Sequence, residues 1–361
     1  MSVPQRVAVA MSGGVDSATT AAWLLEQGYA VRGITARFWR ERESDADIAA
    51  ARAVCDHLDI AHEVVDLRDA FHEVVVRRFI REYARGRTPN PCIACNRELK
   101  FGLLLAQAAA RGERLATGHY AQIASGPEGW RLLSAVDATK DQSYFLYMLG
   151  QEQLAQVLLP LGSWRKADVI AWARSRGLPS ADRAESQDVC FVADGDYRRF
   201  IRERAPELLQ PGPILDEQGR VLGEHRGLAL YTVGQREGLG ISAREPLYVL
   251  ALDPARNALV VGPASALGHR ALLAEEVAFV SGSAPQATVA LQAKIRYRAR
   301  PAPCRLTPLN RDRALIEFDA PLRDITPGQA VVMYNEDVVI GGGTIAHAVS
   351  AAETEEVAAT C

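Results

Sequence analysis

The N-terminal part of the chain alternates short apolar runs with longer segments in which apolar residues recur every three or four positions. Strands are predicted at residues 7–11, 31–38 and 63–65, and helices at 16–27, 48–58, 70–83 and 98–110. A short continuous apolar run is typical of a strand that is buried on both faces. Alternating strands and helices predict an α/β domain in which helices flank a parallel sheet.

A cluster of prolines and glycines at residues 205–213 ends this alternation and predicts a domain boundary. Short strand-like segments and turns follow, which predict a small central α+β or β domain. Further on, strand-like runs at residues 287–299, 314–318 and 330–334 predict a C-terminal β-barrel-like domain. We therefore expect domains at residues 1–205, 206–270 and 271–350, followed by an acidic, frayed tail at residues 351–361.

Composition narrows the class of protein. The 361 residues carry a formal net charge of −3, so any nucleic-acid binding must come from local basic patches. No apolar run approaches the roughly 20 residues of a membrane-spanning helix, and the N-terminus shows no secretory pattern. Six cysteines are too few for a disulfide scaffold in a chain of this length. We expect a cytoplasmic monomer without a membrane partner.

The sequence SGGVDS at residues 12–17 lies between a predicted buried strand and a predicted helix. Two glycines let the backbone approach a ligand closely, and a helix N-terminus offers N–H groups to a phosphate. Ser12 and Ser17 add hydroxyl donors, and Asp16 is placed to orient the loop or a Mg²⁺ ion. The alternative is a glycine turn capped by Asp16. The loop lacks the lysine of the G-x-x-x-x-G-K-[ST] motif, which disfavours a kinase that transfers the γ-phosphate.

Three cysteines stand in polar surroundings that indicate chemistry. Cys92 and Cys95 precede a helix that is predicted to start near residue 97, and its dipole would stabilise a thiolate. Their basic neighbours in the sequence are Arg87, Arg97 and Lys100. Cys190 follows the polar segment ESQDV. The alternative is a set of buried structural thiols, whereas zinc is disfavoured because no second Cys or His pair lies nearby.

The segment between Val277 and Arg311 contains no acidic residue. Within it, every second residue is a cation over the stretch Lys294, Arg296, Arg298 and Arg300. Residues two apart share one face of a strand, so these cations are predicted to form one basic face. Like charges on one face repel each other, which favours phosphate contacts over a solvated edge strand. A second basic stretch, at residues 77–87, leads into the cysteine segment and is predicted to supply a second set of contacts to a nucleic-acid backbone.

Three of these segments together resemble the tRNA-specific 2-thiouridylase (MnmA) family of the PP-loop ATP-pyrophosphatase superfamily. They are SGGVDS at residues 12–17, NPCIACN at 90–96 and SQDVCF at 186–191. Further matches are ATGHY at 116–120, KDQSYFL at 140–146, YTVGQR at 231–236, RY at 296–297, TPGQ at 326–329 and GGG at 341–343. The resemblance therefore extends over almost the whole chain.

The resemblance also implies roles for individual residues. The ATP site would comprise Ala10, Met11, Ser12, Gly13, Gly14, Val15, Asp16, Ser17, Ala36 and Gly118. The nucleophile of the family corresponds to Cys95 and its persulfide-carrying cysteine to Cys190. The segment that faces the target base corresponds to Asn90, Pro91 and Cys92. The positions that contact tRNA correspond to His119, Lys140, Asp141, Gln142, Arg296, Tyr297 and Gln329.

The implied reaction is ATP-dependent 2-thiolation of the wobble uridine, position 34, in the tRNAs that accept Lys, Glu and Gln. Uridine O2 attacks the α-phosphate of ATP, and pyrophosphate leaves. Sulfur from a persulfide on Cys190 then replaces AMP at C2, with Cys95 assisting and a Cys95–Cys190 disulfide as one outcome. The implied cofactors are ATP and Mg²⁺, and the implied partners are tRNA and a persulfide sulfur donor, either a cysteine desulfurase or a sulfur-relay protein.

Cys92 departs from the family pattern, because many members carry Asp at this position. Three thiolates, from Cys92, Cys95 and Cys190, would together ligate a four-iron four-sulfur cluster with one open iron. Thiolation with such a cluster is the alternative to persulfide chemistry. Another PP-loop ligase or amidotransferase would leave the cysteines unexplained. A non-catalytic, ATP-dependent RNA-binding regulator is disfavoured by the intact loop and the three cysteines.

Overall fold

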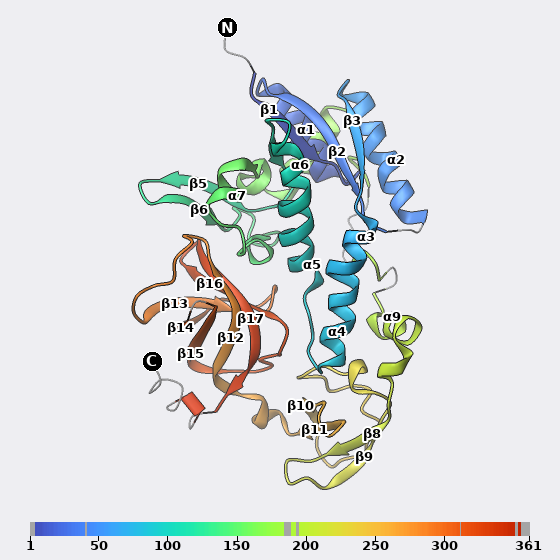
Figure 1. The fold of residues 1–361 in the computed structure, drawn as a ribbon, viewed down its shortest axis with the longest axis vertical. Coiled ribbons are helices and arrows are strands. Elements are labelled where there is room, and N and C mark those ends of the chain that lie inside the picture. Colours follow the sequence, from blue (N-terminus) through green and yellow to red (C-terminus); the bar gives the residue numbers. More distant parts are fainter. Residues whose placement is uncertain are drawn as a thin grey trace.

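The computed structural model describes residues 4–39, 42–183, 189–192, 195–310, 312–350 and 353–354. The SQD part of the third motif, at residues 186–188, and most of the predicted tail lie outside this set. Three units follow one another along the chain: a parallel sheet with helices, a small central sheet and a barrel (Figure 1). None of the helices in the described ranges has the length and apolar character needed to cross a membrane.

The N-terminal unit is built on five parallel strands in the order β3–β2–β1–β4–β7. They are β1 (Arg6–Ala10), β2 (Ala30–Arg37), β3 (His62–Asp66), β4 (Arg114–Ala116) and β7 (Val157–Leu158). Val7 and Val9 pack on one face of the sheet and Ala8 on the other, and all three are fully buried. The first face is covered by α1 (Val15–Glu26), α2 (Arg42–His57) and α8 (Lys166–Ser175). The predicted parallel sheet with flanking helices is confirmed.

Two long helical segments are longer than the apolar pattern predicts. The first comprises α3 (Arg68–Phe71), a π-helical stretch (His72–Arg77) and α4 (Arg78–Ala84). The second comprises α5 (Pro91–Ala94), a π-helical stretch (Cys95–Leu104) and α6 (Leu105–Ala109), and it packs on the second face of the sheet.

The predicted start of the second helical segment near residue 97 is wrong, because the segment begins at Pro91. Asn90 caps it, and the Asn90 Oδ1 accepts a hydrogen bond from the Cys92 N–H at 3.2 Å. Proline suits the first helical position, where the backbone N–H has no partner in the helix. The NPC motif is therefore itself the start of the helix.

The central unit is a four-stranded sheet in the order β10–β11–β8–β9. Its strands are β8 (Gly212–Leu215), β9 (Val221–His225), β10 (Tyr248–Asp253) and β11 (Ala258–Gly262). Ile214, Val249 and Leu259 are fully buried in its small core. The sheet lies at the end of the molecule opposite β1, and α9 (Tyr197–Arg204) precedes it (Figure 1). A further short helix, α7 (Gln151–Gln156), belongs to the N-terminal unit and lies beside β6 (Gly129–Leu133).

Six antiparallel strands form the C-terminal barrel in the order β12–β15–β14–β13–β16–β17, and pairing of β12 with β17 closes it. They are β12 (His269–Phe279), β13 (Val289–Lys294), β14 (Ala302–Asn310), β15 (Arg313–Leu322), β16 (Ala330–Asn335) and β17 (Val338–Val349). Leu306, Ile316 and Val331 are fully buried in its core. The predicted barrel is confirmed.

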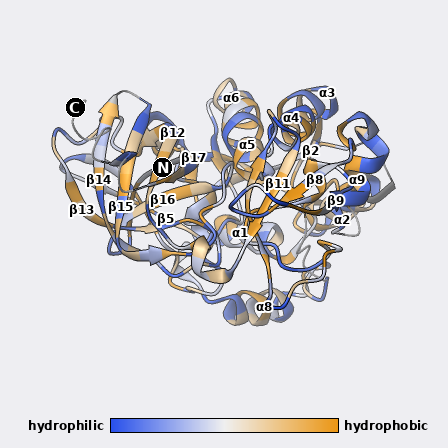
Figure 2. Cartoon of the chain, turned by 90° about the horizontal axis from the view of Figure 1, so that it is seen from below, coloured by the Kyte–Doolittle hydropathy of each residue, from blue (hydrophilic) through white to orange (hydrophobic). Residues whose placement is uncertain are grey.

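Outside the barrel, helices such as α2 and α9 turn their hydrophilic faces outward (Figure 2).

A hairpin from the N-terminal unit extends the barrel sheet. It consists of β5 (Gln122–Gly126) and β6 (Gly129–Leu133), and β6 pairs with β17 at Leu132 and Leu133. The N-terminal unit and the barrel therefore share one sheet, which holds the barrel against the unit that carries the cysteine motif.

The predicted basic face of a strand is wrong. Strand β13 ends at Lys294, and the Ala299 N–H donates to the Arg296 carbonyl oxygen at 3.1 Å in a turn. Ala293 pairs with Ala302 of the next strand, so the chain must reverse between these two residues. The alternating cations therefore occupy a hairpin connection, and the period-two pattern does not place them on one face.

Candidate active site

The phosphate loop turns directly from β1 into α1, as the sequence predicts. Gly13 has φ +76°, and an added Cβ would lie 2.7 Å from the Asp47 carbonyl oxygen, so the loop requires glycine there. The Ser17 Oγ donates to the Gly14 carbonyl oxygen at 3.0 Å and accepts from the Ser12 N–H at 3.2 Å. These bonds hold the loop against the first turn of α1, the arrangement that binds anions at helix N-termini.

Asp16, the acidic residue of the loop, is held by two side chains whose roles the sequence did not indicate. The Lys166 ammonium donates to the two carboxylate oxygens at 2.7 and 2.8 Å, and the Tyr120 hydroxyl donates at 2.7 Å. Lys166 is the first residue of α8, and its side chain is only 9% exposed. This charge-assisted contact fixes a cation beside the phosphate loop.

The other predicted ATP residues lie around the same edge of the sheet. Ala10 ends β1, Ala36 is close to the end of β2, and Gly118 follows β4. The carboxyl ends of parallel strands form one edge, where ligands of such sheets bind. An added Cβ at Gly118 would lie 2.9 Å from the main-chain carbon of Asp16, so Gly118 permits close packing against the loop. The structure thus brings the predicted ATP residues together.

The three candidate cysteines lie around one aromatic cluster. Phe191 is buried against Phe79, with ring centroids 5.2 Å apart, in the same cluster as Cys95. This packing holds Cys190 next to the helical segment 91–109, which carries Cys92 and Cys95. Cys92 and Cys190 are exposed, Cys95 is buried, and all three are free thiols. The sulfurs of Cys92 and Cys95 are close enough to influence the ionisation of Cys190.

The predicted stabilisation of the thiolates is wrong for this state of the protein. Although Cys190 is exposed as a residue, desolvation by the protein packed around its sulfur raises its pKa to about 12, and the two neighbouring thiols add to this rise. Burial likewise raises the pKa of Cys92 and of Cys95, against the opposing charge of Lys100. Cys95 lies beyond the first turn of its helix, so the helix dipole does not offset the effect of burial on its pKa. Arg97 does not offset it either, because its guanidinium forms an ion pair with Glu98.

At about pH 7 we expect iodoacetamide to label Cys190 and Cys92 slowly, although both residues are exposed, because a thiol with a raised pKa stays protonated. The rate should keep rising with pH past about 9, whereas free cysteine approaches a plateau above its ordinary pKa of about 8.5. Mass spectrometry of the labelled peptides measures both rates, with free cysteine as the control. A plateau below about pH 8 would contradict the raised pKa values.

Two residues that the resemblance assigns to tRNA have partners inside the protein. The His119 Nδ1 lies 2.7 Å from the Thr117 Oγ1, and burial lowers the pKa of His119 well below its ordinary value, so the ring is neutral. Asp141 is buried and accepts from the Ser143 N–H at 3.1 Å and the Ser143 Oγ at 3.0 Å. These contacts order the loop at residues 140–142. Contact of the loop with RNA stays a prediction.

Three further predicted tRNA residues lie in turns of the barrel. The Arg296 Nη2 donates to the Thr326 Oγ1 at 2.9 Å. The ring of Tyr297 packs on an aromatic ring of the N-terminal unit, with centroids 4.4 Å apart. The Gln329 Nε2 donates to the Thr88 carbonyl oxygen at 2.8 Å, just before the predicted target-base segment. Tyr297 and Gln329 thus hold the barrel against the N-terminal unit, and their contact with tRNA stays a prediction.

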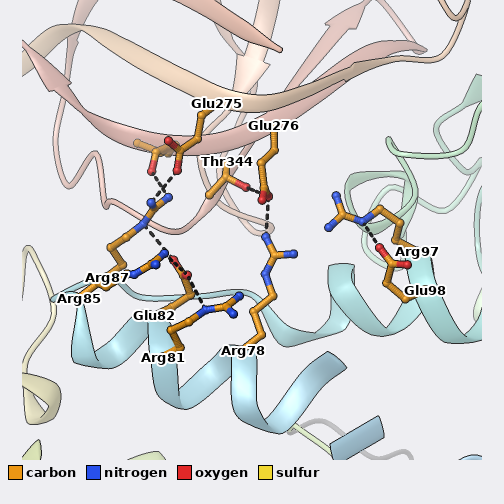
Figure 3. Close-up of polar contacts among 11 residues, drawn as sticks. Arg78, Arg81, Glu82, Arg85, Arg87, Arg97, Glu98, Glu275, Glu276 and Thr344 are labelled. Carbon is orange, nitrogen blue, oxygen red and sulfur yellow. Dashed lines mark hydrogen bonds and ion pairs between the residues drawn. The ribbon is translucent and has the colours of Figure 1, made fainter. Parts of the chain in front are cut away.

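The basic stretch at residues 77–87 is committed to ion pairs within the protein (Figure 3). Arg78 pairs with Glu276 at 2.5 Å and Arg87 pairs with Glu275 at 2.6 Å, and both glutamates belong to β12. The buried carboxylate of Glu82 lies within 4.0 Å of Arg81, Arg85 and Arg87. Arg78 and Arg87 therefore tie this helix to the barrel, whereas Arg77, Arg81 and Arg85 remain exposed, and contact of the stretch with an RNA backbone stays a prediction.

Comparison with known proteins matches this architecture between residues 5 and 345. Three family models match in order: the tRNA methyl transferase HUP domain at residues 5–194, the tRNA methyl transferase PRC-barrel domain at 198–263 and the aminomethyltransferase beta-barrel domain at 269–345. The parallel sheet and its glycine loop therefore define a nucleotide-binding PP-loop protein.

Relatives narrow the class further. A protein of Roseiflexus castenholzii is 50% identical and covers 94% of this chain and 99% of its own length. Proteins of Moorella thermoacetica and Chloroflexus aurantiacus are 51% and 48% identical, cover 93% and 94% of this chain, and match over 98% of their own lengths. All three are named tRNA-specific 2-thiouridylase MnmA. The chain belongs to the tRNA-specific 2-thiouridylase family.

Proposed function

We propose that this protein catalyses the ATP-dependent 2-thiolation of the wobble uridine, position 34, of tRNA. The observation that carries the proposal is membership of the 2-thiouridylase family over nearly the full length of chain and relatives. The phosphate loop and the three free thiols support it. The protein is then a tRNA-uridine 2-sulfurtransferase whose substrates are the tRNAs that accept Lys, Glu and Gln.

The first step adenylates the base. Uridine O2 attacks the α-phosphorus of ATP, the bond between the α- and β-phosphates breaks, and pyrophosphate leaves. The loop binds the triphosphate at the start of α1, and the ammonium of Lys166 beside it stabilises negative charge on the phosphate oxygens. Mg²⁺ enters with ATP as part of the substrate.

The second step exchanges AMP for sulfur. The terminal sulfur of a Cys190 persulfide attacks C2, and AMP leaves with the bonding electron pair. The Cys95 thiolate then attacks the Cys190 sulfur, and the bond between Cys190 and the transferred sulfur breaks, which leaves a thiocarbonyl on the base. The resulting Cys95–Cys190 disulfide must be reduced by an external thiol before the next turnover. The exposure of Cys190 supports loading by a persulfide-carrying protein.

The cluster hypothesis remains the alternative to this second step. Over the described part of the chain, no group of three His, Cys, Asp or Glu side chains is placed to hold a metal ion. Cys92, Cys95 and Cys190 as arranged therefore do not fit a cluster, and we assign no step to one. We further propose that the protein acts in the cytoplasm, because its free thiols suit a reducing compartment.

Nucleoside mass spectrometry tests the proposed function. With an unmodified tRNA-Lys transcript, ATP and a persulfide donor, we expect 2-thiouridine at position 34 and one AMP for each thiolated base. A transcript with cytidine at position 34 serves as the control and should yield neither product. The absence of 2-thiouridine from the first transcript would overturn the proposal.

A further inference from the structure

A second cation, besides Lys166, lies against the phosphate loop. An added Cβ at Gly13 would come within 2.6 Å of the Arg183 Nη1, so the guanidinium lies on the backbone of the loop. The Arg183 Nη2 donates to the Asp47 Oδ1 of α2 at 2.5 Å. Over the described part of the chain, the Arg183 Nη1 has no hydrogen-bond acceptor. One nitrogen of the guanidinium is therefore held by α2, and the other faces the loop with unused N–H groups.

The turns that follow α8 fix the position of Arg183. Leu178 and Ala181 are buried in the core that covers the first face of the sheet. The Ala181 N–H donates to the Leu178 carbonyl oxygen at 3.0 Å, and the Arg183 N–H donates to the Ser180 carbonyl oxygen at 3.1 Å. Both the backbone and the side chain of Arg183 are thus held in place. A phosphate at the loop meets a guanidinium that is already oriented.

The contact between Arg183 and Asp47 serves orientation more than stability. The side chain of Arg183 is 33% exposed and that of Asp47 is 55% exposed, and ion pairs between such groups contribute little to the stability of a fold. A guanidinium is suited to phosphate because its planar fork donates several hydrogen bonds at once, whereas an ammonium such as that of Lys166 acts as a point charge. The loop therefore has two cations of different kinds beside it.

The two faces of the sheet indicate which phosphates Arg183 can reach. Helices α1 and α2 and the turns that lead to Arg183 cover the first face, whereas the helical segment 91–109, with Cys92 and Cys95, packs on the second. The uridine that attacks the α-phosphorus must also reach the sulfur, so the α-phosphate faces the side of the cysteines. Arg183 approaches the loop from the other side, where the β- and γ-phosphates lie.

Resting on the proposed adenylation step, we propose that Arg183 binds the β- and γ-phosphates of ATP. When uridine O2 attacks the α-phosphorus, the bond between this phosphorus and the oxygen that bridges to the β-phosphate breaks, and its electron pair stays on pyrophosphate. The Arg183 Nη1 donates to an oxygen of this leaving group and stabilises its charge. Arg183 is then a residue that contacts the substrate in the reaction, in addition to the loop and Lys166.

The experiment compares Arg183→Gln with the matched control Arg176→Gln. Arg176 follows α8 directly and pairs with Glu26 at 2.9 Å, and its side chain is 39% exposed, close to the exposure of Arg183. Glu26 is the last of the 12 residues of α1, so this pair lies about 18 Å from the loop. Calorimetry measures the affinities for ATP and for AMP with Mg²⁺ and without tRNA, and thermal unfolding reports the stability of each variant.

We expect Arg183→Gln to weaken the binding of ATP by at least about tenfold and that of AMP by less than about twofold, because AMP lacks the phosphates that Arg183 contacts. Arg176→Gln should leave both affinities unchanged. Arg183→Lys keeps the charge but not the fork, and it should weaken ATP binding less than Arg183→Gln does. It also serves as the test if the glutamine variant does not fold, again with unchanged binding of AMP.

Three results would contradict the inference: unchanged ATP binding by Arg183→Gln, equal losses for ATP and AMP, or the same loss of ATP binding in Arg183→Gln and Arg176→Gln. Failure of the wild-type protein to bind ATP would remove the proposed function and this inference together. If the wild-type protein binds ATP, Arg183→Gln shows the selective loss, and yet no 2-thiouridine forms on tRNA, the proposed function fails while the role of Arg183 at the phosphates stands.

Discussion

Replacing Cys190 with serine should abolish formation of 2-thiouridine, by at least about 10³-fold, while the protein still forms pyrophosphate from ATP in the presence of tRNA. A serine hydroxyl cannot carry a persulfide, so the sulfur that replaces AMP at C2 is never loaded. The phosphate loop lies at the edge of the parallel sheet and does not contain Cys190, so the adenylation step keeps its machinery. Pyrophosphate release and nucleoside mass spectrometry on the same reactions measure the two steps separately.

The matched control for this variant is Cys92→Ser. Cys92 and Cys190 are both exposed free thiols, and both have a raised pKa, yet the persulfide mechanism assigns no step to Cys92. Under that mechanism we expect Cys92→Ser to retain thiolation within a few-fold of wild type. If it loses thiolation as completely as Cys190→Ser, and anaerobically purified wild-type protein contains iron and acid-labile sulfide, the cluster hypothesis is the better one.

Replacing Lys166 with glutamine should lower the rate of adenylation by about 10²- to 10³-fold. The ammonium of Lys166 contacts both oxygens of Asp16 in the phosphate loop, so glutamine removes a positive charge where the triphosphate would bind. The measurement is tRNA-dependent release of pyrophosphate, together with the affinity for ATP.

Lys166→Arg is the control for this second prediction, because it keeps the positive charge and changes only its geometry. We expect it to retain more activity than the glutamine variant. A normal rate of pyrophosphate release by Lys166→Gln would show that the charge of Lys166 only balances Asp16 in the free protein. Thermal unfolding of both variants separates loss of activity from loss of stability.

The phosphate loop is predictable from the sequence because the strand, the glycines and the helix that define it are neighbours in the chain. Lys166 is not, since its partner Asp16 lies 150 residues away and the start of α8 carries no distinguishing pattern. The orientation of Glu276 toward the arginine-bearing helix is not predictable from the sequence either, for a different reason. Its orientation depends on a shift of register between two barrel strands, and the alternation of residues along one strand does not encode such a shift.

Two failures show where local patterns mislead. The alternating cations from Lys294 onward read as one face of a strand, but the pairing of β13 with β14 requires the chain to turn within them. The position of Cys95 before the predicted helix suggested a stabilised thiolate, but the helix begins earlier and the packing around the sulfur raises its pKa. In both cases tertiary structure decided the outcome.

The hairpin of β5 and β6 bears on how this architecture can be divided. Because β6 continues the sheet through β17, the barrel has part of its structure encoded more than 100 residues upstream of its first strand. A fragment that starts at residue 270 would lack β6 and leave backbone groups of Val338 and Val339 open to pair with another chain. The barrel is thus a separate region of sequence but not an interchangeable module, since any exchange must bring along a hairpin from the nucleotide-binding unit.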